Sequence, residues 1–551
     1  KNNVWVKQNS SYITAGNQAG LLKKVTFNGL NRWYELSNYK RGLPQLITVP
    51  NRSTSGSMSA SRVVDNNGWV TRTTDHNGIL TNYTYDDMGR IKSVDLTNDA
   101  VNGNWYDTLY AWNNDTNTRT VSTCTLNSSR TACSGNAVFR TTEYYDNLLR
   151  LTKTTSQDLV NSSAANSTRY QRFEYNYLNQ PTFQAYASAN ISENKGTTTV
   201  YDSLGRQQSV TTSGLGTVNY AYLSGNRIEV TDAKNYVTTT TYQAFGFPNY
   251  SRPVKIESPE GVTTSLDIDV FGLTHSIQQT GPNKSGTLTT ITERRYYDSN
   301  KRLCLITRPD VGNSVYKYSA LGELVWSKTG VTNTECTNSA PSQSIFYTYD
   351  NLGSLKLVNY PDTSGDVSYE RDNNGNVKTL TAGNVIHRYE YNNQNLLEEE
   401  QLFVGDELPL MLNYTYNGLQ HKNQIGYPDG TVIRLKPNGF GAPTEAQVYK
   451  NGNVDLSFAK NAHYYPNGML SSFTYGNGIT HKTTLHVDSL LPKQLKDTGP
   501  SDSNLPSTVM SLTYDYDSNS NVTSIIDGQN SAYSLTSLGY DGLDRLTSTT
   551  G

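Results

Sequence analysis

The sequence of 551 residues is poor in strongly apolar and in charged side chains. It holds only 12 Phe, 6 Trp and 5 Met, and 17% of its residues are charged. Apolar residues including Tyr make up 35%. If the 42 glycines are counted as apolar in place of the 40 tyrosines, the apolar fraction is again about 35%. Globular domains counted in that way have about 45–50%. No run of about 18 apolar residues is present, which predicts no membrane-spanning helix. A solid core of ordinary size is therefore not expected.

Common catalytic and cofactor motifs are also missing. The sequence has no Gly-x-Ser-x-Gly elbow, no phosphate loop and no His-Glu-x-x-His helix. The run from Asp517 to Asn521 resembles the start of a calcium loop, but Val522 stands where Gly is needed and Gly528 where Glu is needed. The net charge of −2, without a basic block, disfavours nucleic-acid binding. We expect no cofactor, no metal and no enzymatic activity.

Tyrosine, in contrast, is abundant and recurs as Tyr-Asp in one setting: an alternating stretch precedes it, and a turn leading to Arg or a polar residue follows. Two copies are complete and five more keep the frame, with a spacing of roughly 20 to 30 residues that is typical of a repeat protein. The predicted repeat residues are Tyr85, Asp86, Gly89, Arg90, Tyr145, Asp146, Arg150, Tyr201, Asp202, Gly205, Arg206, Tyr297, Asp298, Arg302, Tyr349, Asp350, Gly353, Tyr516, Asp517, Tyr540, Asp541 and Arg545.

The motif itself predicts a β-hairpin. Tyr83 and Tyr85 are two positions apart, so in a strand they point to one face. Asp86 can open a turn by accepting a backbone hydrogen bond, and Gly89 tolerates a positive φ. The alternating stretch 90–94 then predicts the return strand.

This pattern resembles the YD-repeat, or RHS-repeat, family of large bacterial surface and toxin proteins. The Tyr-Pro-Asp elements at 360–362 and 427–429 are similar to bacterial members as well. The resemblance implies hairpins that form a long sheet, spiralling into a hollow shell that commonly encloses a C-terminal toxin. Family members that release a toxin carry an Asp-Pro-rich autoprotease segment, and no Asp-Pro dipeptide occurs in these 551 residues.

The expected fold is all-β: a long antiparallel hairpin-repeat sheet that spirals into a hollow shell. At about 10 residues per strand and turn the chain makes on the order of 50 strands, and open sheets rarely exceed about 10 strands without curling. Such a wall should surround a lumen larger than the roughly 300–1,000 Å³ of a ligand pocket. We expect an N-terminal β segment at residues 1–75, either a plug or the first coil, and the repeat shell at 76–551.

The four cysteines are Cys124, Cys133, Cys304 and Cys336. An even count without a Cys-x-x-Cys spacing favours the bridges Cys124–Cys133 and Cys304–Cys336, with four reduced thiols as the alternative. Disulfides would indicate an oxidising compartment, so the chain is expected to be secreted or on a cell surface.

Two functions follow from this interpretation. The first is a non-catalytic shell that encloses and delivers a cargo polypeptide, such as a toxin domain. The second is an adhesion module that contacts a target-cell surface or a glycan, because Tyr and Trp with polar neighbours can contact sugars. Against glycan binding, we expect tyrosine rings to stack on each other across neighbouring hairpins. The chain opens at Lys1 and stops inside a repeat, and we expect it to be a piece of a longer protein.

Overall fold

A computed structural model gives the fold of the chain. It describes residues 8–551 except 28–30, 99–102, 104, 163, 165, 245–248, 363–364 and 501–505. Within these ranges the chain is built from β-strands, and its only helical elements are two 3₁₀ turns, η1 (Pro259–Gly261) and η2 (Ser531–Tyr533). The predicted all-β class is confirmed. No helix in the described part is long and apolar enough to cross a membrane.

The strands of the first half are β1 (Gln8–Tyr12), β2 (Leu22–Phe27), β3 (Trp33–Lys40), β4 (Leu43–Pro50), β5 (Ser57–Val64), β6 (Val70–Thr74), β7 (Leu80–Tyr85), β8 (Ile91–Leu96), β9 (Asp107–Asn113), β10 (Thr118–Cys124), β11 (Phe139–Tyr145), β12 (Leu151–Asp158), β13 (Thr168–Tyr175), β14 (Pro181–Ala185), β15 (Gly196–Tyr201), β16 (Gln207–Thr212), β17 (Gly216–Leu223), β18 (Arg227–Thr231), β19 (Val237–Tyr242), β20 (Pro253–Glu257), β21 (Thr263–Ile268) and β22 (Thr274–Pro282).

Those of the second half are β23 (Leu288–Tyr297), β24 (Leu303–Thr307), β25 (Asn313–Tyr318), β26 (Leu324–Val331), β27 (Ile345–Tyr349), β28 (Leu355–Asn359), β29 (Val367–Arg371), β30 (Val377–Ala382), β31 (Val385–Tyr391), β32 (Leu397–Val404), β33 (Leu410–Tyr416), β34 (Lys422–Gly426), β35 (Val432–Pro437), β36 (Pro443–Lys450), β37 (Asn453–Tyr464), β38 (Leu470–Tyr475), β39 (Thr480–Leu485), β40 (Pro492–Thr498), β41 (Met510–Tyr516), β42 (Val522–Asp527), β43 (Ser537–Tyr540) and β44 (Leu546–Thr550).

Strands β1 to β42 form one 42-stranded antiparallel sheet, and β43 and β44 form a separate hairpin. Each strand of the sheet pairs with its neighbours in sequence, as β7 does with β6 and β8. The segment before residue 76 therefore continues into the sheet without a break between β6 and β7. The division into parts at 1–75 and 76–551 stays a prediction.

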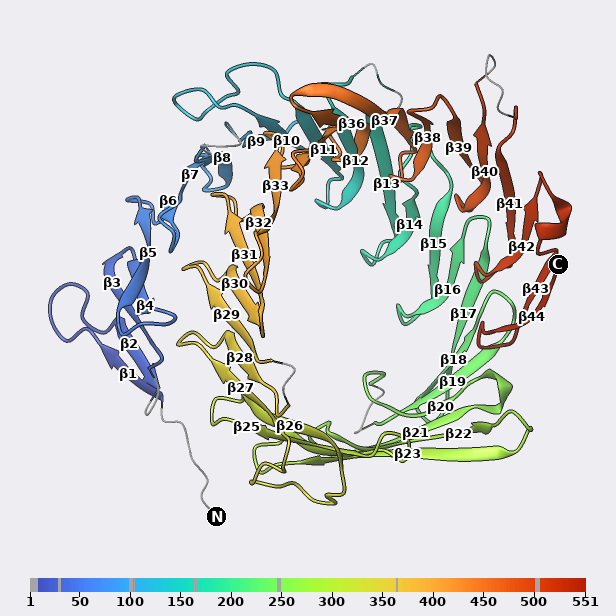
Figure 1. Cartoon of the computed structure of the whole chain (residues 1–551), viewed down its shortest axis with the longest axis horizontal. Coiled ribbons are helices and arrows are strands. Elements are labelled where there is room, and N and C mark those ends of the chain that lie inside the picture. The colour runs from blue at the N-terminus through green and yellow to red at the C-terminus, as the bar shows by residue number, and fades with distance from the viewer. Residues whose placement is uncertain are drawn as a thin grey trace.

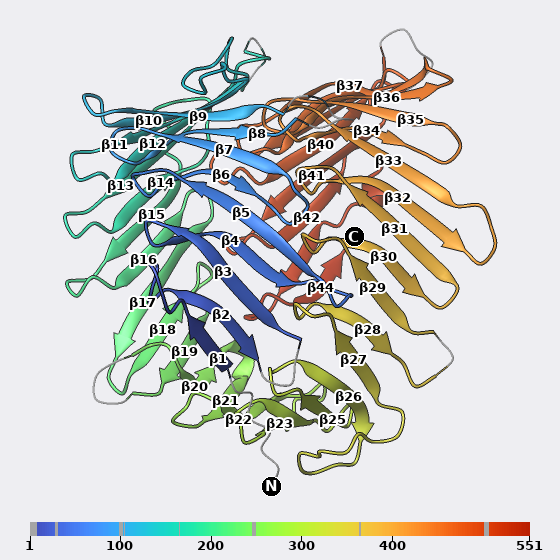
Figure 2. The same ribbon diagram turned by 90° about the vertical axis from the view of Figure 1, so that its left-hand side faces the viewer.

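The sheet curls into a wall of two coils (Figure 1). The first coil runs from β1 to β22, and the second, from β23 to β42 with the hairpin β43–β44 at its end, lies beside it (Figure 2). No described segment crosses the centre of the ring in Figure 1. Hydrogen bonds between the coils join residues that are 281 to 318 positions apart, which measures the length of one coil. The volume of the lumen stays a prediction.

Buried apolar side chains are gathered in small clusters within the wall. One cluster joins the two coils, because Trp105 of the first packs with Tyr414 and Tyr416 of the second. The Trp105 indole Nε1 also donates a 2.7 Å hydrogen bond to Asn393. Another cluster lies inside the second coil, between β24, β25 and β26. This distribution agrees with the low apolar content of the sequence.

Candidate functional site: the hairpin turns and the seam between coils

The Tyr-Asp turn is a compact hydrogen-bonded loop, as residues 86–90 show. The Asp86 amide donates to the Arg90 carbonyl oxygen at 2.9 Å, and the Gly89 amide donates to the Asp86 carbonyl oxygen at 2.9 Å. One carboxylate oxygen of Asp86 accepts from the amides of Met88 and Arg90 at 3.0 and 2.9 Å. Its other oxygen pairs with Arg90 Nε at 2.7 Å. The aspartate thus stabilises the turn that it opens, as the motif predicted.

The other predicted motif aspartates repeat this geometry. Each accepts amide hydrogen bonds from the second and fourth residues after it, at 2.8 to 3.0 Å; they are Asp146, Asp202, Asp298, Asp350, Asp517 and Asp541. The third position after the aspartate has a positive φ, as at Gly89 with 78° and Gly205 with 76°. Leu149 occupies the equivalent position at 60°, although an apolar side chain disfavours that conformation.

Five of the seven motif tyrosines bond their hairpin to the preceding one, whereas the Tyr145 hydroxyl donates to the Glu143 carboxylate of its own strand. The Tyr85 hydroxyl donates at 2.8 Å to the carbonyl oxygen of Val70, the first residue of β6. Tyr201 makes the same contact with Pro181, the first residue of β14, at 2.9 Å. Tyr297, Tyr349 and Tyr540 follow the same rule.

The expected contact of tyrosine rings across neighbouring hairpins occurs between Tyr222 and Tyr250, with centroids 5.5 Å apart. The motif tyrosines of the described part show no ring contact with another tyrosine. Their rings contact other neighbours, such as Trp69 beside Tyr85 and His275 beside Tyr297, both in the preceding hairpin. The recurrent link is the phenol-to-carbonyl bond, which five of the seven motif tyrosines make.

The motif arginine extends this link in the other direction along the sheet. Arg206 pairs with Asp202 in its own turn at 2.6 Å. Its guanidinium also lies over the ring of Tyr222, 3.9 Å from the centroid, on the next hairpin. Arg150 and Arg302 lie over Tyr175 and Tyr318 in the same manner. Each complete motif therefore touches the hairpin before it and the hairpin after it.

Most turns of the second coil lack this arginine, and the first coil supplies a cation to several of them, including Arg32 to Glu323 in the Ser319 turn. Ser354 stands where the Asp350 turn would have Arg, and Arg52 pairs with Asp350 at 2.9 Å instead. Both side chains are largely buried, at 14% and 8% exposure. Lys234 likewise pairs with Asp517 at 3.0 Å. We call this line of contacts between the coils the seam.

Further polar contacts follow the whole seam. The Gly439 amide donates to Asp158 at 2.7 Å, and Asn166 donates to the Tyr464 carbonyl oxygen at 2.7 Å. A side chain at Gly439 would meet the Asp158 carboxylate at 2.8 Å, so this approach requires glycine. Sequence reasoning missed the seam because its partners are nearly 300 residues apart. The one available signal was the loss of the motif arginine from two copies of the second coil, those at Asp350 and Asp517.

The seam gives the two edges of each coil different roles. The motif edge of a coil is the end of its hairpins that carries the Tyr-Asp turns, and the other end is its opposite edge. The motif edge of the second coil packs on the opposite edge of the first. Within the described residues no segment packs on the motif edge of the first coil, and we call this edge the free rim. Its turn tips expose apolar side chains, at 51% to 90%: Met88, Leu148, Leu149, Tyr177, Leu178, Leu204, Val270 and Phe271.

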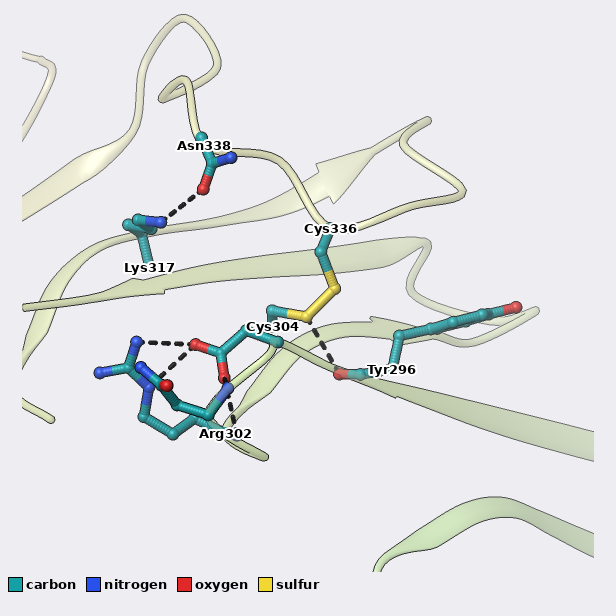
Figure 3. The surroundings of a disulfide bond; sticks show 8 residues. Tyr296, Arg302, Cys304, Lys317, Cys336 and Asn338 are labelled. Atoms are coloured by element: carbon teal, nitrogen blue, oxygen red, sulfur yellow. Dashed lines mark hydrogen bonds and ion pairs between the residues drawn. A yellow bond between two sulfur atoms is a disulfide. The ribbon is translucent and has the colours of Figure 1, made fainter. Parts of the chain in front are cut away.

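Both predicted disulfides are present. Cys124–Cys133 closes a short loop, and Cys304–Cys336 ties β24 to the segment between β26 and β27 (Figure 3). In the same figure Cys304 Sγ contacts the Tyr296 carbonyl oxygen at 3.3 Å. The alternative of four reduced thiols is not what the structure shows.

The electrostatics of the turns favour ionised aspartates. The hydrogen bond from the Arg206 side chain lowers the pKa of Asp202. Burial, the largest influence on Asp517, raises its pKa, but hydrogen bonds from Asn521 and Lys234 outweigh burial and the pKa is lowered. No group of three His, Cys, Asp or Glu in the described ranges could hold a metal ion.

Comparisons with known proteins agree with this geometry. Residues 64–100, which include the Asp86 turn, match the RHS Repeat family. No curated protein sequence matches the chain. Among solved structures, the chain is similar to TcdB2-TccC3-Cdc42, with a TM-score of 0.73 and 13% identity over 96% of this chain and 33% of that chain. TcdB2-TccC3-TEV matches with a TM-score of 0.69 and 14% identity over 99% and 33%.

A Photorhabdus luminescens Tc holotoxin pore matches with a TM-score of 0.64 and 12% identity, over 99% of this chain and 34% of that chain. The chain thus spans about a third of the length of the chains that it matches. At these identities the likeness concerns the fold. The chain therefore carries an RHS repeat at residues 64–100 and has, over nearly its whole length, the β-shell fold of the toxin-complex structures.

Proposed function

We propose that this chain is a non-catalytic wall that encloses a cargo polypeptide, in the manner of a toxin shell, and that it acts outside the cell or on its surface. The observation that carries the proposal is the seam: two coils of one sheet are bonded edge to edge around an open centre (Figure 1). A protein that only displayed an adhesive surface would not need its sheet to return to itself after nearly 300 residues.

Two further observations support the proposal. The solved structures with this fold include a Tc holotoxin pore and a TcdB2-TccC3 complex described as lacking its hypervariable C-terminal region. A cargo polypeptide that is made as part of the shell protein would form such a variable C-terminal region. The two disulfides favour an oxidising compartment and hence a secreted or surface location.

A protease fixed to beads tests enclosure, because it cannot enter the lumen and can cut only peptides that lie outside the wall. A flexible reporter peptide with one cleavage site is fused after Gly551, and its cleavage rate is compared with that of the same peptide on a small solid carrier. We expect cleavage to be slowed at least tenfold by the wall. Equal rates would reject enclosure and leave surface adhesion as the better account, to be examined by binding to a glycan array.

A further inference from the structure

The two disulfides differ in how easily a thiol in solution can reach them. Cys336 is exposed, while its partner Cys304 is only 3% exposed. In the other bridge Cys124 is completely buried and Cys133 is half-buried. Thiol–disulfide exchange requires a thiolate to approach one sulfur of the bridge, so the rate of reduction depends on access. Cys304–Cys336 is therefore the bridge that a thiol can attack from solvent.

The two bridges also differ in what they enclose. Cys304 belongs to β24 and Cys336 lies beyond β26, so this bridge spans the whole hairpin formed by β25 and β26. These two strands pair with each other at six positions, but β25 pairs with β24 at only two and β26 with β27 at only two. The Cys124–Cys133 bridge closes a loop between β10 and β11 and encloses no strand. Of the two bridges, only Cys304–Cys336 holds together strands that share few backbone pairs.

The segment 332–344 leads from β26 to β27 without forming a strand, and Cys336 anchors it to the wall. Two side chains of β25 hold it as well. Asn313 donates to the Asn333 carbonyl oxygen at 2.7 Å, and Lys317 donates to Asn338 at 2.5 Å, beside the disulfide in Figure 3. A hydrogen bond that water can replace stabilises much less than a covalent bridge. The disulfide is thus the strongest anchor of this segment.

The junction between β26 and β27 depends on this anchor more than the junctions before it. The buried cluster of Leu305, Val315 and Trp326 lies on β24, β25 and β26 and secures these strands to one another. Between β26 and β27, hydrogen bonds of the Tyr347 and Tyr349 hydroxyls add to the two residue pairs. Release of the segment 332–344 would leave the junction with these few contacts.

We propose that Cys304–Cys336 is a redox-sensitive strap: it is closed outside the cell, and the thiols of a reducing compartment open it and loosen the wall between β26 and β27. Such compartments keep cysteines reduced, whereas extracellular proteins keep their disulfides. The loosened junction would let a cargo leave the wall after entry into a reducing compartment. This last consequence rests on the proposed function, whereas the strap itself does not.

The chemistry of opening is ordinary thiol–disulfide exchange. A thiolate attacks Cys336 Sγ, forms a mixed disulfide with it and expels Cys304 as a thiolate, which takes up a proton. A second thiol attacks the mixed disulfide, releases Cys336 and leaves as the oxidised reagent, so two electrons pass to the bridge. The reduced Cys304 thiol has an acceptor in place, the Tyr296 carbonyl oxygen at 3.3 Å.

Selective reduction is the first test. The folded chain is incubated with reduced glutathione, and samples are quenched with excess N-ethylmaleimide in denaturant, so that mass spectrometry detects each reduced cysteine whether it was buried or exposed. We expect Cys304 and Cys336 to be reduced at least about tenfold faster than Cys124 and Cys133, because only Cys336 is exposed. Equal rates, faster reduction of Cys124–Cys133, or a Cys304–Cys336 bridge that glutathione leaves intact would overturn the proposal.

Hydrogen exchange then measures what the strap holds. In the selectively reduced chain the amides of β26 and β27 should exchange at least about tenfold faster, while those of β10 and β11 stay unchanged. Cys336→Ser should reproduce this pattern without a reductant. Cys133→Ser is the matched control, whose effect should stay near the loop between β10 and β11. If β27 exchanges no faster, or if exchange rises over the whole wall, the bridge is not a local strap and the proposal fails.

Discussion

The Tyr-Asp turns of the first and second coils share one backbone but differ in what surrounds them. In the first coil Arg206 neutralises the aspartate of its own turn. In the second coil Ser354 replaces the arginine of the Asp350 turn, and Arg52 arrives from the other coil. The comparison teaches that the cation beside a turn carboxylate can come from the same turn or from the neighbouring coil, and that only the second arrangement bonds the two coils together.

Acid should have the largest effect, because it acts on both coils. The pKa values of Asp202 and Asp517 are lower than those of ordinary aspartates. A carboxylate with a lowered folded pKa stabilises the fold above its unfolded pKa of about 3.9, and that contribution is lost as the pH falls through the folded value. We expect denaturation midpoints to hold from pH 7 to about 5 and to collapse below about pH 4. A loss that is complete by pH 5 would contradict this.

Removing a cation from the seam should lower the free energy of unfolding more than removing the arginine of a turn in the first coil. Arg52→Ala leaves the buried Asp350 carboxylate unpaired and should cost about 3–5 kcal/mol. Arg90→Ala is the matched control in the first coil, where the pair with Asp86 is 32% and 24% exposed and should cost only about 0–1 kcal/mol. Chemical denaturation of both variants measures the difference. Equal costs would show that the seam contributes nothing beyond its turns.

The two disulfides should differ in the stability that they give. Cys304 and Cys336 are 32 positions apart, and loop-closure entropy assigns the bridge about 3.7 kcal/mol. Cys124 and Cys133 are 9 apart, which gives about 2.6 kcal/mol. Paired Cys→Ser variants, compared by denaturation, should rank in that order. Thiol titration of the unfolded, unreduced chain should find no free thiol.

A single phenol hydroxyl should have the smallest effect. Tyr201→Phe removes the hydrogen bond to the Pro181 carbonyl oxygen and should cost about 0.5–1.5 kcal/mol. Tyr516→Phe serves as the control. The Tyr516 ring contacts His486, but its hydroxyl donates no hydrogen bond to a described residue. If both variants lower the melting temperature equally, ring packing links the hairpins and the hydroxyl hydrogen bond does not.

The hairpin could be predicted from sequence because its physics is local. Asp86, Gly89 and Arg90 lie within five residues, so spacing alone indicated the turn and its return strand. The seam could not be predicted, since Arg52 and Asp350 meet only after the sheet has curled through a whole coil. The curl depends on small twists added over many strands, and no single residue reports that sum.

Small-angle X-ray scattering of the intact chain tests the central claim, a two-coil wall around an open centre, most directly. A solid globule of 551 residues would have a radius of gyration of roughly 24 Å. We predict a clearly larger radius and a pair-distance distribution whose maximum is shifted towards long distances, as a hollow body gives. A radius near 24 Å with a symmetrical distribution, or the profile of a thin flat ribbon, would contradict the account.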